Sequence, residues 1–87
     1  MKDIELLKKD FSKKLHIKIG ENVKNIRKEK GVSQLKLAYA IGYKSVSPIS
    51  SAEVYYNNIH FNLENLAKIA YVLDVDICEF FKNLELE

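Results

Sequence analysis

Residues 31–42 read Gly-Val-Ser-Gln-Leu-Lys-Leu-Ala-Tyr-Ala-Ile-Gly, and this stretch decides the fold. Ser33 is expected to cap a helix, because a serine hydroxyl accepts hydrogen bonds from the free N–H groups of the first helical turn. Leu37, Ala38 and Ile41 recur at the spacing of one buried helix face. The glycine at each end supplies the left-handed conformation that commonly ends a helix. The stretch therefore predicts a short helix that follows one helix end and stops at a tight turn.

A second short helix is expected two turn residues after the second glycine, with Ile49 and Ala52 facing inward. We begin this recognition segment near Ser45, which can cap it, although a cap at Ser47 is also compatible with the sequence. Pro48 then falls in the first turn under either choice, where its missing N–H interrupts no helical hydrogen bond. Two short helices joined through a glycine have the outline of a helix-turn-helix.

Before residue 31, apolar residues recur every three or four positions, which predicts an amphipathic helix. They are Ile4, Leu7, Phe11, Leu15, Ile19, Val23 and Ile26. The pattern fits one helix ending near Glu29, or two helices separated by a break between His16 and Gly20. We favour the break, since glycine inside a helix costs about 1 kcal/mol relative to alanine.

Residues 54–61 show no period and are expected to form a polar loop. Asn62 is the expected cap of the next helix. The inward residues of that helix are expected to be Leu63, Leu66, Ile69, Ala70 and Leu73. Asp76 and Glu79 are three residues apart, as in a capping box, and predict a short terminal helix that buries Ile77 and Phe80, with Phe81 as a further candidate.

The chain has 87 residues, of which 47% are hydrophobic and 30% charged, a balance typical of one globular domain. We expect an all-α fold, a compact bundle of about five short helices with an additional N-terminal helical segment. The division is a helical extension over 1–18, a helix-turn-helix domain over 19–83 and a tail over 84–87. No apolar stretch approaches the roughly 18 residues of a membrane span, and the start lacks the pattern of a signal peptide. A cytoplasmic protein with no membrane partner is expected.

The net charge is +2, but it is distributed unevenly. Residues 1–30 carry a net charge of +5, residues 31–60 of +1 and residues 61–87 of −4. A basic half suits a polyanion, because neutralising phosphates releases condensed counterions. The lysines equally fit the solvated outer face of a helix.

The residues give no sign of catalysis. Paired carboxylates, a nucleophile with a base, and a glycine-rich phosphate loop are all missing from the sequence, so an enzyme is not expected. Cys78 is the single cysteine and is expected to be a buried thiol. His16 and His60 lie too far from it in sequence to suggest zinc, so neither a metal nor another cofactor is expected.

The segment from Ile19 to Phe81 resembles the Cro- and lambda-repressor-like (XRE-type) helix-turn-helix family. The resemblance is carried by the Gly-x-Ser-Gln-x-x-Leu-Ala motif of residues 31–38 and by the apolar register around it. It implies a lambda-repressor-like bundle whose third helix enters the DNA major groove. It also implies a sequence-specific transcriptional regulator, in particular a repressor, that acts as a homodimer on half-sites about one DNA turn apart.

The resemblance implies a DNA contact at Gln34, and further candidate contacts follow from a cap at Ser45 and from the polar loop after the third helix. Together the candidate positions are Gln34, Lys44, Ser45, Val46, Ser47, Pro48, Ser51, Tyr55 and Asn58. Gln34 holds a phosphate or braces the third helix, and Lys44 contacts a guanine edge or a phosphate. The serines and the apolar Val46 and Pro48 offer only weak base discrimination, because paired bonds from Arg, Asn or Gln are missing from this helix.

The turn before the third helix is one residue longer than is usual in the family, and the loop after that helix is about two residues longer. These departures leave a second function open, a protein-interaction module, such as a toxin partner, that has kept the fold and lost its DNA readout. The segment before Ile19 is not required by the family fold. Its apolar Ile4, Leu7 and Phe11 either contact a second copy in the dimer or fold back onto the chain's own core.

Overall fold

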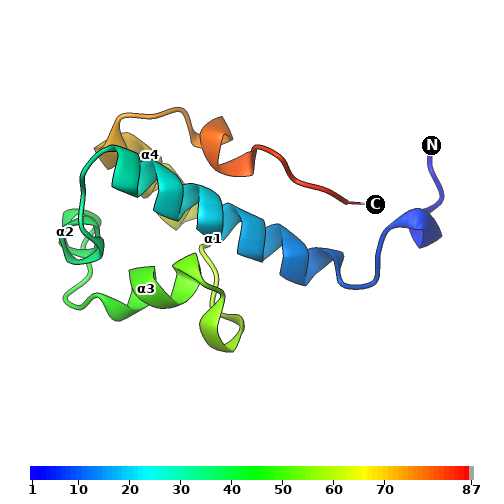
Figure 1. The fold of residues 1–87 in the computed structure, drawn as a ribbon, viewed down its shortest axis with the longest axis horizontal. Coiled ribbons are helices and arrows are strands. Elements are labelled where there is room, and N and C mark those ends of the chain that lie inside the picture. The colour runs from blue at the N-terminus through cyan, green and yellow to red at the C-terminus, as the bar shows by residue number, and fades with distance from the viewer. Residues whose placement is uncertain (87) are drawn as a thin grey trace.

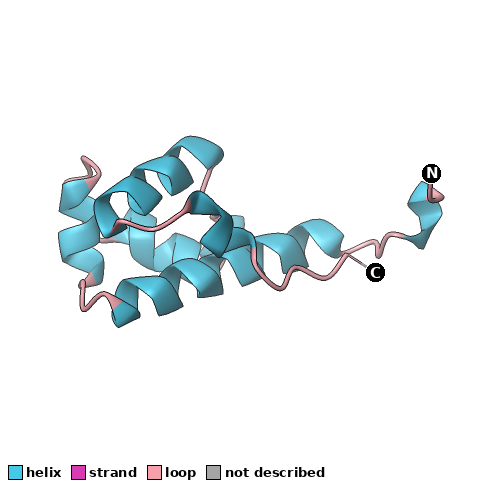
Figure 2. Ribbon diagram, turned by 90° about the horizontal axis from the view of Figure 1, so that it is seen from above, coloured by secondary structure: helices cyan, strands magenta, loops and turns pink. Residues whose placement is uncertain are grey.

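The computed structural model describes residues 1–86, and over that range it contains helices and no strand (Figures 1 and 2). The four α-helices are α1 (Phe11–Glu29), α2 (Gln34–Ala40), α3 (Ser47–Glu53) and α4 (Leu63–Leu73). Three short 3₁₀ helices complete the chain: η1 (Ile4–Leu6), η2 (Tyr56–Asn58) and η3 (Ile77–Phe81). The predicted all-α bundle is confirmed. Residue 87, the last of the predicted tail, lies outside the described residues.

α1 runs without interruption from Phe11 to Glu29, so the predicted break between His16 and Gly20 is wrong. The chain instead leaves helical geometry at Leu7, which is extended. Gly20 is buried, and a Cβ placed on it would lie 2.7 Å from the carbonyl oxygen of Ala52. The glycine therefore permits the close approach of α1 to the end of α3, and the predicted domain boundary after residue 18 falls inside α1.

The two glycines that frame α2 act as predicted. Gly31 has φ +70° and Gly42 has φ +99°, the left-handed conformation of a helix end. After each glycine the next N–H returns to a carbonyl in the last turn of the preceding helix, Val32 to Arg27 at 3.1 Å and Tyr43 to Ala38 at 2.9 Å. At the other end of α2 the Ser33 hydroxyl accepts from the N–H of Lys36 at 3.0 Å. The outline of a helix-turn-helix is thus set by local hydrogen bonds.

The start of α3 differs from both predicted caps. Val46 occupies the cap position, without a side-chain hydrogen bond, and the helix begins at Ser47. A serine cap accepts from the N–H two or three residues further on, and for Ser45 the third residue is Pro48, which has no N–H. The observed cap therefore lies one residue after the predicted Ser45, the helix starts at Ser47, and Pro48 lies in its first turn as expected.

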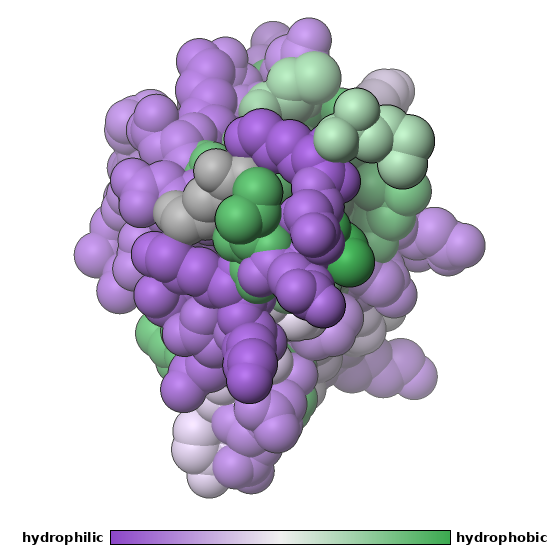
Figure 3. All heavy atoms as spheres, turned by 90° about the vertical axis from the view of Figure 1, so that its right-hand side faces the viewer, coloured by the Kyte–Doolittle hydropathy of each residue, from purple (hydrophilic) through white to green (hydrophobic). Residues whose placement is uncertain are grey.

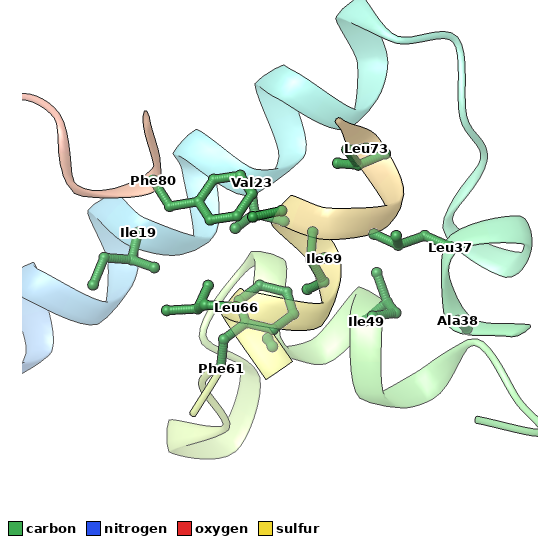
Figure 4. Packing of buried hydrophobic residues seen from close by; sticks show 12 residues of the cluster. Ile19, Val23, Leu37, Ala38, Ile49, Phe61, Leu66, Ile69, Leu73 and Phe80 are labelled. Carbon is green, nitrogen blue, oxygen red and sulfur yellow. The ribbon is translucent and has the colours of Figure 1, made fainter. Parts of the chain in front are cut away.

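All four α-helices contribute to one hydrophobic core (Figure 4). Its buried residues are Ile19, Val23, Leu37, Ala38, Ile49, Ala52, Phe61, Leu66, Ile69, Ala70, Leu73 and Phe80. Phe80 of η3 packs over α1 and is fully buried, as predicted. Phe61 was missed, because the loop around it is polar in sequence.

Two residues predicted to be buried are exposed, and one residue makes hydrogen bonds that the sequence did not predict. Leu63, expected on the inner face of α4, is exposed, and so is Cys78, expected to be a buried thiol. Asn22 of α1 donates to the carbonyl oxygens of Phe80 at 3.0 Å and Lys82 at 2.9 Å, which fastens η3 to α1.

Among the described residues, none of the helices is both long and apolar enough to cross a bilayer.

Candidate nucleic-acid interface

α3 has an inner face in the core and an outer face open to solvent. Ile49 and Ala52 are buried, at 0% and 2% exposure. On the outer side Ser47 is exposed, while Pro48 and Ser51 are half-buried. The preceding turn adds exposed Lys44 and Ser45 and half-buried Val46. The structure thus gathers the six candidate positions of residues 44–51 on α3 and the turn that leads into it.

The end of α3 is fixed by a buried ion pair. Glu53, 1% exposed, accepts two hydrogen bonds from the guanidinium of Arg27, at 2.7 Å and 3.0 Å. Arg27, 6% exposed, also donates to the Val32 carbonyl at 2.8 Å. Both charges are fully engaged, which is the condition under which a buried pair is tolerated. The pair links α1, the start of the helix-turn-helix and α3.

Gln34 completes this network. Its side-chain amide donates to the Glu53 carboxylate at 2.8 Å, so the residue braces α3 from the start of α2. The amide nitrogen carries a second hydrogen, and because Gln34 is only half-buried, that hydrogen is available to a phosphate. Bracing and phosphate contact are therefore compatible roles for this residue.

The turn before α3 is also held in place. The side-chain amide of Asn65 in α4 donates to the Tyr43 hydroxyl at 2.7 Å. Tyr43 belongs to the longer turn predicted from the sequence, and this bond ties that turn to the core helix α4. The sequence offered no signal for the pairing, because the two residues are 22 positions apart.

The loop that follows α3 has an irregular backbone. Tyr55, Asn57 and Asn58 have φ between +50° and +63°, a conformation that asparagine tolerates and that is uncommon for tyrosine. Asn58 is exposed. The Tyr55 ring is half-buried and lies parallel to the His16 ring, with centroids 6.1 Å apart, so packing accounts for part of its role.

Two histidines stack where this loop meets α1. The rings of His16 and His60 have centroids 3.7 Å apart and planes inclined by 16°. Burial lowers the pKa of His16 below its ordinary value, and the charge of protonated His60 lowers that pKa further. The stack therefore favours a neutral His16 and joins the loop after α3 to the first half of α1.

Acidification is expected to weaken the fold through this stack. Because folding lowers the pKa of His16, the unfolded chain takes up the proton at higher pH than the folded one does. The stabilisation is complete above the ordinary histidine pKa of about 6.5 and declines as the pH falls through the lower folded value. Thermal melts between pH 7.5 and 5 measure this loss. His16→Phe keeps a stacked ring that cannot be protonated, so the melting temperature of this variant should depend less on pH. A pH dependence equal to that of the wild type would contradict the role given to His16.

The predicted dimer residues lie at the start of α1 and in the segment before it. Ile4 is 76% exposed and Phe11 is 36% exposed, while Leu7 is half-buried. The alternative that this segment folds back onto the chain's own core is therefore wrong for Ile4.

The chain is similar to several solved structures. The restriction-modification controller protein C.AhdI from Aeromonas hydrophila is 32% identical with a TM-score of 0.65, over 75% of this chain and 94% of that one. The controller protein C.Esp1396I is 33% identical with a TM-score of 0.65, over 80% and 88%. SinR, a master regulator for biofilm formation solved in complex with DNA, is 36% identical with a TM-score of 0.57, over 71% and 95%. No protein-family model matches the chain, and no curated protein sequence matches it.

Proposed function

Because the chain belongs to the Cro- and lambda-repressor-like (XRE-type) helix-turn-helix family, we propose that it binds double-stranded DNA sequence-specifically and represses transcription. The observation that carries this proposal is the open outer face of α3, whose inner face is locked into the core. A helix held in this way can enter the major groove without rearrangement of the domain. The similarity to SinR, solved in complex with DNA, supports the same function.

The proposed readout is weak at each base. Ser45, Ser47 and Ser51 supply single hydroxyls, and Val46 and Pro48 supply apolar contacts suited to thymine methyl groups. Lys44 and the free hydrogen of the Gln34 amide contact phosphates, and Tyr55 and Asn58 do so from the following loop. Affinity then comes mainly from the DNA backbone and discrimination from the sum of several small contacts.

Weak contacts make a second copy of the protein necessary. A single module of this kind buries roughly 600 to 1,000 Å² on DNA. Two copies on an inverted repeat double the number of contacts and square the discrimination between sequences, with half-sites about one DNA turn apart. We therefore propose that the regulator acts as a homodimer.

Ser47→Glu tests the interface directly. Ser47 is exposed in the first turn of α3, where the helix dipole favours a negative charge, so the fold should be unaffected. The same charge would face phosphates in the bound state, and affinity for duplex DNA should fall by about tenfold or more. Fluorescence anisotropy with a labelled random duplex, over a series of salt concentrations, measures the effect.

Ala67→Glu is the matched control. Ala67 is exposed on α4, and a new carboxylate there should leave DNA affinity within about twofold of the original. Equal losses in the two variants would reject α3 as the contact surface. Selection of bound duplexes from a random pool then gives the target, and an inverted repeat is the expected result.

The same salt titration distinguishes a DNA-binding regulator from a protein-interaction module. An interaction module that has lost DNA readout would not bind duplex DNA even at about 50 mM salt, whereas a DNA-binding regulator would bind there and lose affinity steeply as salt rises.

A further inference from the structure

One side of α1 continues the surface that α3 presents. Gly20 lies against the end of α3, where a Cβ on it would be 2.7 Å from the carbonyl oxygen of Ala52. His16, one turn earlier in α1, stacks on His60 of the loop that follows α3, with ring centroids 3.7 Å apart. Lys13 is exposed and precedes His16 by three residues, a spacing that keeps both on one side of a helix. Along this side, α1 therefore meets α3, then the loop, and then solvent at Lys13.

The amino-terminal half of α1 extends past that loop. α3 and the loop lie on one side of α1 in Figure 1, and the first turns of α1 project beyond them. Figure 3 looks onto this end of the molecule, where mostly hydrophilic side chains surround a few apolar ones. Lys13 is seven residues from Gly20, which at 1.5 Å per residue places it about 10 Å further along the helix axis. A lysine so far from α3 needs a separate account of what it contacts.

The surface formed by α3 and its flanking turns carries no exposed acidic side chain. Between residues 30 and 63 the sequence contains a single acidic residue, Glu53. Its carboxylate is 1% exposed and is engaged by the guanidinium of Arg27. A polyanion that covers α3 and the loop would therefore meet no repelling charge on its way to Lys13.

The lysines in the first half of α1 are of two kinds. The ammonium group of Lys14 is 3.6 Å from the carboxylate of Asp10, and that of Lys18 is 3.7 Å from the carboxylate of Glu21. Among residues 1–86, Lys13 has no such acidic partner. Lys14 follows Lys13 by one residue, so a rotation of about 100° around the axis separates the two side chains. Lys13 alone of these three combines the α3 side of the helix with a charge that is not neutralised.

We propose that Lys13 holds a phosphate of the DNA strand that borders the groove entered by α3. The inference rests on the proposed function and adds a contact outside α3 and its loop. Packed helices are about 8 to 10 Å apart, so α1 lies about that far behind α3. The major groove is about 8.5 Å deep, so the strands at its rim return toward α1 by a similar distance. A lysine on the α3 side of α1 then meets backbone phosphate and no base edge.

This contact gives the amino-terminal half of α1 a role in DNA binding. The serines of α3 discriminate weakly between bases, so affinity depends on the number of phosphates that the protein neutralises. A phosphate held at Lys13 lies at one edge of the half-site and lengthens the stretch of backbone that each copy covers. The contact strengthens binding to every sequence equally.

Lys13→Gln tests the contact, and Lys14→Gln is the matched control. Both lysines are exposed in the first turn of α1, and each change removes one positive charge. The readout is the slope of log affinity against log salt, measured with the full chain and a labelled random duplex. One lost phosphate contact should lower this slope by about 0.9, so the deficit of Lys13→Gln relative to the wild type should shrink by about threefold between about 50 and 200 mM salt. Lys14→Gln should keep the wild-type slope.

Ethylation interference on a selected target duplex locates the phosphate. Ethylation of one phosphate at an edge of each half-site should weaken binding of the wild type and leave binding of Lys13→Gln unchanged. The proposal is overturned by a wild-type slope in Lys13→Gln, by equal loss of slope in both glutamine variants, or by the same interference pattern in Lys13→Gln and the wild type.

Ser47→Glu distinguishes failure of this contact from failure of the proposed function. Weaker binding by Ser47→Glu together with a wild-type slope in Lys13→Gln would reject the contact on α1 and keep α3 as the interface. A lower slope in Lys13→Gln with unchanged affinity in Ser47→Glu would uphold the contact and reject α3. A wild-type protein that does not bind duplex DNA at about 50 mM salt would reject both.

Discussion

Glu53→Ala should remove a large part of the protein's stability. The change leaves the guanidinium of Arg27, only 6% exposed, without a counter-charge, and also removes the partner of the Gln34 amide. Breaking one side of a buried pair typically costs about 3 to 5 kcal/mol. A domain of this size is stable by about 5 to 15 kcal/mol in all. The melting temperature is therefore expected to fall by about 15 °C or more, measured by circular dichroism.

The ion pair between Lys82 and Glu79 provides the control, because its atoms are also 2.7 Å apart but its side chains are 61% and 39% exposed. Glu79→Ala should leave the melting temperature nearly unchanged, since water already solvates both charges. The double variant Arg27→Met with Glu53→Leu should recover much of the loss, because no unpaired charge remains. A single Glu53→Ala variant as stable as Glu79→Ala would contradict the role given to burial.

Gly20→Ala should destabilise the protein although alanine is the better helix former. The new methyl group would lie 2.7 Å from the carbonyl oxygen of Ala52 and 2.8 Å from that of Glu53. Both are backbone atoms that cannot rotate away, so α3 must move from α1. Overpacking costs typically about 1 to 3 kcal/mol and occasionally more, which exceeds the roughly 1 kcal/mol gained in helix propensity. Denaturant unfolding measures the difference, and DNA affinity should fall with it.

Asn25→Ala on the same helix isolates the clash. Asn25 is exposed in α1, so alanine there adds helix propensity and meets no neighbouring backbone. Equal or higher stability of this variant, together with lower stability of Gly20→Ala, is the expected pair of results. Stabilisation by both substitutions would show that α1 and α3 are not as close as described.

The helix-turn-helix could be predicted from the sequence because its signals are local. The Ser33 cap and the glycines at 31 and 42 determine the backbone within a few residues, and the observed hydrogen bonds follow from them. The apolar periods of α1 and α4 identified most of the core for the same reason. Leu63, the first residue of α4, falls on the predicted period but is 68% exposed, whereas Leu66, three residues later, is buried.

The errors arose where distant residues decide the structure. A glycine inside an amphipathic period predicts a break in the helix, and only the position of α3 reveals that Gly20 serves a close contact. Arg27 and Glu53 are 26 positions apart, and the stacked His16 and His60 lie on different elements, so neither pair has a signature in one sequence. The start of α3 is a local exception: neither of the two candidate caps, Ser45 and Ser47, is used, and for Ser45 the N–H that a cap would need three residues on is missing at Pro48.

The division of α3 into a locked face and an open one has a consequence for how this protein can change over time. Ser47 and Ser51 lie one helical turn apart on the outer side, and neither is among the residues that fill the core. Under the proposed readout, substituting them with arginine, asparagine or glutamine would change the DNA sequence that is bound without repacking a single buried side chain. Sequence preference could then diverge while Ile49, Ala52 and Glu53 stay the same.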